Sequence, residues 1–162
     1  MLQIIHKTEQ SYILIRLCFS PFQIVIDTGR NIRYVQSGFL GHLNDAGQFA
    51  LMPNIGPGQE LPFPEEMYLL GDNGYPNRYP VMTKFRAHQI RQAATEEDRT
   101  AMHIFNEEHS RCRIYAEHVI SYFKTYRAVK EMYRHPRWMM PIVAEVCACL
   151  AQRHIRLSEE IH

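Results

Sequence analysis

Residues 105–127 read FNEEHSRCRIYAEHVISYFKTYR, a stretch whose apolar side chains recur at steps of three and four. This period predicts a long helix with one face in a core. We expect the helix to begin after Thr95, because a hydroxyl N-cap followed by acidic residues stabilises a helix N-terminus. The expected core face runs to about Tyr126 and includes Met102, Phe105, Cys112, Ala116, Val119 and Phe123.

A polar stripe lies beside this apolar face at the same spacing. On one interpretation it is a solvated face with an ion pair between Arg113 and Glu117. On the other, Arg113 and Lys124 bind phosphate groups next to the Glu117 carboxylate. Residue spacing alone does not choose between them. The stripe consists of Asn106, Ser110, Arg113, Glu117, Ser121 and Lys124.

Short apolar runs before the helix predict strands. The runs at 12–19 and 22–26 are rich in β-branched and aromatic residues, which favours buried strands. A polar turn at 27–31 and an alternating segment after it make 22–37 a predicted hairpin. A further run at 67–71 leads into Asp72, in turn-forming sequence. Asp72 is thus expected at the carboxyl end of a strand, where active-site side chains collect in open α/β sheets.

Three further segments complete the predicted fold. Asn44 or Asp45 caps a short helix over 46–52, and the proline-rich segment 53–66 forms a surface loop without regular structure. A final apolar helix over 138–155 is expected to pack on the sheet. Trp138 and the two methionines after it are expected in the core. The chain is therefore predicted to be an α/β domain.

Composition excludes several classes of protein. The 162 residues are 46% hydrophobic and 22% charged, which is typical of one globular domain. No window approaches the roughly 18 uninterrupted apolar residues of a membrane span. The start has no signal-peptide pattern, so we expect an intracellular protein. The net charge is only +1, yet Arg111 to Arg156 holds nine basic residues against three acids. This bias indicates either a phosphate-binding surface or a solvated helix face.

Three ordered blocks resemble the PIF/Harbinger family of DDE transposases. YLLGDNGYP at 68–76 resembles the family's "LLGDSGYP", and residues 105–127 resemble "(F/Y)N..HS..R..VE..FG.LK.R". The hairpin followed by GFLGHLNDAGQF resembles a third block, "D..G.I..V..G.PGS.HD...F". The resemblance covers roughly residues 20–155, and three blocks in order are far more specific than one short motif.

The resemblance implies an RNase H-like nuclease, with a mixed central sheet flanked by helices. It assigns Asp72 and Glu117 as catalytic residues and ligands of a divalent cation, Mg²⁺ or Mn²⁺, with DNA as the substrate. Basic residues that would bind DNA phosphates are Arg113, Lys124 and Arg127. A nuclear location is implied, with the cytoplasm as the alternative. The helical DNA-binding domain of the family has no counterpart here, so a separate DNA-binding partner protein is an expectation.

One departure from the family bears on activity. The family's first catalytic Asp lies in an "IDGT" segment on the strand before the hairpin, and Glu9 is the only acid among the first 26 residues. Asp27, in IDTGR, echoes that segment and is the alternative third metal ligand, although the block alignment assigns it to the hairpin turn. We therefore expect an N-terminally incomplete nuclease domain: a divergent segment at 1–19, a partial nuclease at 20–155 and a tail at 156–162. The competing hypothesis is a catalytically dead, domesticated module that binds DNA or protein.

Overall fold

A computed structural model describes residues 12–16, 22–38, 43–131 and 134–160. Within these ranges the chain is a mixed α/β structure, as the sequence predicts. Its main sheet has five strands in the order β3-β2-β1-β6-β7. The strands are β1 (Tyr12–Arg16), β2 (Gln23–Asp27), β3 (Ile32–Gln36), β6 (Leu69–Leu70) and β7 (Val81–Met82).

The strand directions make the sheet mixed. β1, β2 and β3 form an antiparallel meander, which confirms the predicted hairpin between β2 and β3. β6 runs parallel to β1, and β7 runs parallel to β6. The carboxyl ends of β1, β6 and β7 therefore meet at one edge of the sheet.

The long helix α3 (Glu96–Phe123) begins where the sequence predicts. Thr95 is its N-cap, and the Thr95 hydroxyl accepts a hydrogen bond of 3.0 Å from the Asp98 amide. The predicted core face is confirmed from Phe105 to Phe123, whereas Met102 is only partly buried. His109 is an unpredicted member of this face. The buried positions follow each other at steps of four and three: Phe105, His109, Cys112, Ala116, Val119 and Phe123.

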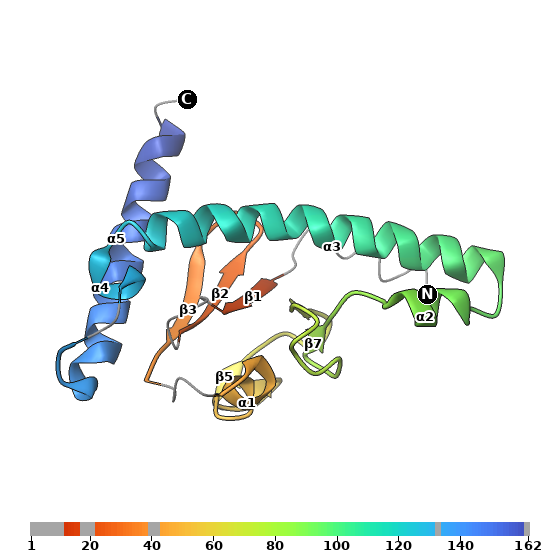
Figure 1. The fold of residues 1–162 in the computed structure, drawn as a ribbon, viewed down its shortest axis with the longest axis horizontal. Helices are drawn as coiled ribbons and strands as arrows, with labels where there is room; N and C mark the ends of the chain where they lie inside the picture. The colour runs from red at the N-terminus through yellow and green to blue at the C-terminus, as the bar shows by residue number, and fades with distance from the viewer. Residues whose placement is uncertain (1–11, 17–21, 39–42, 132–133, 161–162) are drawn as a thin grey trace.

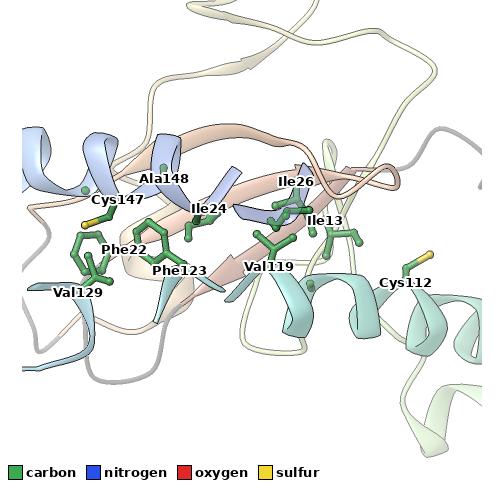
Figure 2. Packing of buried hydrophobic residues seen from close by; sticks show 14 of the residues in the cluster. Ile13, Phe22, Ile24, Ile26, Cys112, Val119, Phe123, Val129, Cys147 and Ala148 are labelled. Atoms are coloured by element: carbon green, nitrogen blue, oxygen red, sulfur yellow. The ribbon is translucent and has the colours of Figure 1, made fainter. Parts of the chain in front are cut away.

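Two helices at the C-terminal end of α3 help to close the main core. These are α4 (Arg127–Lys130) and α5 (Met140–Glu160), and α5 packs on β3 and α3, which confirms the expected final helix. Figure 1 shows α3 lying across the meander and continuing past β7 to the short helix α2 (Ala87–Arg91). Figure 2 shows side chains from the sheet, α3, α4 and α5 meeting in this core, where the Phe22 and Phe123 rings pack edge to face at 5.8 Å.

The sheet is buried on both faces, and β2 shows this most clearly. Ile24 and Ile26 belong to the core under α3 and α5, whereas Val25 between them belongs to a second cluster with Leu69 and Tyr75. Alternate residues of a strand point to opposite faces. The second cluster lies on the side of helix α1 (Asp45–Phe49), capped by Asn44, whose side chain accepts from the Gly47 amide at 2.8 Å.

Two predictions about the remaining segments are wrong. Segment 53–66 contains a small parallel sheet of β4 (Ile55–Gly56) and β5 (Leu61–Pro62). Strands of two residues need few backbone hydrogen bonds, so proline at an edge is tolerated. Trp138 is 70% and Met139 36% exposed rather than buried, because both lie in the 3₁₀ turn Arg137–Met139, ahead of the buried face of α5. No helix in the described ranges has the length and apolar character needed to cross a bilayer.

Candidate functional site

Asp72 follows β6 at the carboxyl edge of the sheet, as the sequence predicts. The preceding residue, Gly71, donates its amide to the Met82 carbonyl of β7 at 2.9 Å. The Asp72 carbonyl accepts from the Tyr75 amide at 2.9 Å, and its Oδ1 accepts from the Asn73 amide at 2.7 Å. The Asp72 side chain is 57% exposed. A tight turn therefore presents this carboxylate to solvent.

Arg113 of α3 reaches this carboxylate. Its guanidinium nitrogen lies 3.0 Å from Asp72 Oδ1, so α3 and the end of β6 are joined by an ion pair. One of the two interpretations of the sequence paired Arg113 with Glu117, whereas the structure pairs it with Asp72. Glu117 is one helical turn away, but the turn after β6 brings a second carboxylate close to the same guanidinium. Because both side chains of the observed pair are well exposed, it contributes at most about 1 kcal/mol to stability.

Glu117 lies on the same side of α3 as Arg113. Residues four apart on a helix are neighbours, with Cβ atoms roughly 5–6 Å apart. Glu117 is exposed and makes no ion pair with any residue in the described ranges. The structure therefore places Asp72 against Arg113, and Glu117 one helical turn further along the same side of α3.

Two side chains of α3 hold the segments that follow β6 and β7. Asn106 donates to the Phe85 carbonyl and accepts from the Phe85 amide, both at 2.9 Å. His109 Nε2 lies 2.9 Å from the Gly71 carbonyl. The sequence pattern placed Asn106 on a solvent stripe and did not include His109 in the core face. The available signal was the seven-residue gap between Phe105 and Cys112, which a side chain at 109 fills at helical spacing.

The environment of His109 favours the neutral ring. Burial lowers the pKa of His109, and the charges of Lys84 and Arg113 lower it further. The backbone carbonyls of Gly71 and Met82 act in the opposite direction without cancelling this shift. Since a carbonyl oxygen only accepts, Nε2 carries the proton in the bond to Gly71.

Asp27 is engaged by its own hairpin. Its Oδ1 accepts from the Asn31 amide at 2.9 Å, and its Oδ2 accepts from Arg33 Nε at 2.8 Å. The side chain is only 15% exposed. Burial raises the pKa of Asp27, but the bonds from Asn31 and Arg33 outweigh it and hold the pKa below the usual 3.8. This carboxylate therefore stabilises the turn between β2 and β3.

Strand register places Asp27 and Asp72 toward opposite ends of the strands in the main sheet. Asp27 pairs with Tyr12, and Tyr12 in turn pairs with Leu69 at the start of β6. Asp72 comes three residues after Leu69, about 10 Å further along the sheet. Asp27 also belongs to a different strand, with β1 between. We therefore assign Asp27 to the hairpin rather than to a metal site shared with Asp72.

The other predicted phosphate-binding residues are spread along the chain. Lys124 follows the last turn of α3 and is partly buried. Arg127 begins α4, is 84% exposed and pairs with Glu131 at 2.9 Å. Of the three predicted cations, only Arg113 contacts a candidate catalytic residue.

The carboxylates fit a divalent cation only in part. Asp72 and Glu117 supply oxygen ligands, and Mg²⁺ is commonly held by one or two carboxylates while keeping several waters. No group of three His, Cys, Asp or Glu side chains in the described ranges is arranged to hold a metal ion. β1, the strand before the hairpin, has the sequence YILIR and carries no acid. Within the described residues two candidate carboxylates are therefore available, and Arg113 competes with a cation for Asp72.

Comparison with known proteins gives one match. A family model described as DDE superfamily endonuclease matches residues 12–152, most of the chain. Searches of curated proteins and of solved structures give no match.

Proposed function

The chain belongs to the DDE superfamily endonuclease family, and from this premise we propose that it is a transposase-derived, divalent-metal-dependent DNA endonuclease of the PIF/Harbinger type. Asp72 and Glu117 are the proposed metal ligands and catalytic residues. The observation that carries the proposal is the Arg113–Asp72 ion pair, since it ties the end of β6 to the turn of α3 that precedes Glu117.

Strand order supports an RNase H-like core. The meander β1–β3 adjoins β6 and β7, which both run parallel to β1. One proposed ligand follows the interior strand β6, and the other comes from a helix packed on the sheet. That convergence of strand and helix carboxylates is what the resemblance implies for this class of nuclease.

When bound, Mg²⁺ or Mn²⁺ supplies Lewis-acid chemistry to a phosphodiester, by activating the attacking oxygen and stabilising the leaving one. The chain's own residues position the reacting groups and balance their charge. The turn after β6 presents the Asp72 carboxylate, and Glu117 lies exposed on α3. Arg113, once released from Asp72, is placed to bind a DNA phosphate beside the two acids, because a guanidinium matches phosphate geometry.

DNA as substrate follows from the family, and further basic residues are available for its backbone. Lys124 lies two helical turns beyond Glu117, and Arg127 is exposed at the start of α4. We include in the proposal a nuclear location, with a separate DNA-binding protein to supply target selection.

A second candidate function is a module that binds DNA or protein without cleavage. Two observations favour it. β1 has no acid at any of its five positions, and Arg113 already neutralises Asp72. The first limits the carboxylates available to a metal, and the second lowers the affinity of Asp72 for a cation.

Nicking of supercoiled plasmid separates the two candidates. We expect the chain to nick DNA with Mn²⁺ or Mg²⁺. The nicking rates of Asp72→Asn and of Glu117→Gln should be at least about tenfold lower. Glu107→Gln is the matched control, because Glu107 is an exposed acid of the same helix away from the site. Equal nicking by all variants would refute the site. DNA binding that weakens with salt, without any nicking, would support the binding module.

A further inference from the structure

His109 occupies a position that packing alone would give to an apolar residue. It lies in the core face of α3 between Phe105 and Cys112, is 2% exposed, and packs with the Phe105 ring at 5.9 Å between centroids. Its Nδ1 is buried and has no hydrogen-bond partner within the described ranges. A buried polar atom without a partner costs free energy. Histidine at this position therefore needs a compensating interaction.

The compensation is the bond from Nε2 to the Gly71 carbonyl, at 2.9 Å. Gly71 is itself buried, and its amide donates to Met82 of β7. Both backbone groups of Gly71 are thus occupied, one by the sheet and one by α3. A Cβ at position 71 would come within 2.8 Å of the Val81 side chain, so the backbone is closely packed here. The residue immediately before Asp72 is fixed from two sides.

The two proposed metal ligands come from different elements, so their separation depends on contacts between those elements. Leu70 of β6 packs in the same apolar core as Phe105 and Cys112 of α3. The polar contacts here include the exposed Arg113–Asp72 pair and the buried His109–Gly71 bond. An exposed ion pair is weak and can open when a cation competes for Asp72. The buried bond remains in place when it does. His109 lies on α3 about two turns before Glu117.

We infer that His109 is a positioning residue, which holds the end of β6 on α3 and so sets the place of the Asp72 carboxylate relative to Glu117. This inference rests on the proposed function for its metal-binding consequence. The anchoring of Gly71 by His109 does not depend on the proposed function. Ligand groups must be held within about 0.5 Å of their productive positions, and supporting hydrogen bonds usually provide that precision.

Hydrogen exchange of the turn after β6 tests the anchoring without any metal. His109→Leu removes the donor and keeps an apolar side chain, whereas His109→Gln can still donate an amide hydrogen to Gly71. Val119→Ala is the matched control, because it weakens the same helix face elsewhere. We expect amides of residues 71–75 to exchange about tenfold faster in His109→Leu, and at the parent rate in His109→Gln and Val119→Ala. If His109→Leu does not fold, His109→Met replaces it.

Titration of Mn²⁺ into the same full-length variants tests the consequence. We expect His109→Leu to bind Mn²⁺ about three- to tenfold more weakly and His109→Gln to retain the parent affinity. Exchange and Mn²⁺ affinity both unchanged in His109→Leu would overturn the inference and leave the proposed function intact. Failure of the parent to bind Mn²⁺ would overturn the proposed function, and the exchange rates would still decide whether His109 anchors Gly71. We expect residues 71–75 to exchange more slowly in Val119→Ala than in His109→Leu. Faster exchange in Val119→Ala would contradict the inference.

Discussion

The turns after β2 and β6 have similar sequences and different uses. Each follows a buried strand, begins with aspartate and contains a glycine two positions later. Asp27 is bound by Asn31 and Arg33 of its own hairpin and is 15% exposed. Asp72 is 57% exposed, and its ion pair comes from a distant helix.

The two aspartates differ in which residues supply hydrogen-bond donors to the carboxylate. When neighbours in sequence supply the donors, the carboxylate is occupied in every folded molecule and serves the turn. When the partners are one adjacent amide and one exposed arginine, both at the same oxygen, the carboxylate remains available to a ligand. The contrast separates a structural acid from a candidate functional one, although the local sequences look alike.

The largest expected effect is on stability. Asp27→Ala should lower the free energy of unfolding by about 2 kcal/mol, because several hydrogen bonds to a charged, part-buried group are lost. Asp72→Ala should lower it by less than about 1 kcal/mol, since an exposed pair is lost. Urea denaturation of both variants gives the comparison. Equal losses would remove the distinction between the two turns.

Acid should weaken the hairpin through Asp27. Because the folded pKa of Asp27 is lowered, its contribution is complete above the unfolded pKa of about 3.9 and is lost as the pH falls through the folded value. The stability of Asp27→Asn should therefore fall less than that of the parent between pH 5 and pH 2. Parallel pH profiles for the two proteins would argue against this account of Asp27.

The turn after β6 should respond to acid in a higher pH range, through His109. The folded pKa of His109 is lowered from 6.5, so below pH 6.5 the unfolded chain binds a proton that the folded chain excludes. Stability therefore falls as the pH drops from 6.5 toward the folded pKa. His109→Gln should flatten the stability profile in this pH range.

The smallest expected effect concerns Arg113. Removing its guanidinium in Arg113→Ala should raise Mn²⁺ affinity about two- to fivefold, because the cation no longer competes with an ion pair for Asp72. Arg111→Ala is the control, since Arg111 pairs with Glu108 on the same helix. Titration calorimetry measures the Mn²⁺ affinity of both variants. A drop in affinity for Arg113→Ala would mean that Arg113 helps to place Asp72 rather than compete for it.

Local patterns were sufficient for much of the fold. The Thr95 cap, the apolar period of α3 and the hairpin at 22–37 could be predicted because each depends on residues close in sequence. β7 and α2 were missed. β7 has two residues, too few for any periodicity to show, and its place depends on pairing with β6.

The candidate site was predictable in its residues and not in its contacts. Asp72 was identified from the turn after a strand, and Glu117 from the family block. The partner of Arg113 could not be chosen, because an acid one turn away is visible in the sequence and an acid across the fold is not. For the same reason, spacing could place His109 on the core face but could not show the Gly71 carbonyl that it binds.

Calorimetric titration of Mn²⁺ into the parent chain and into Asp72→Ala, Glu117→Ala and Asp27→Asn tests the central claim most directly. The account predicts that the parent binds Mn²⁺, that the first two variants bind at least about tenfold more weakly, and that Asp27→Asn binds as the parent does. Loss of binding in Asp27→Asn with full affinity in Asp72→Ala would contradict it, as would a parent that binds no Mn²⁺.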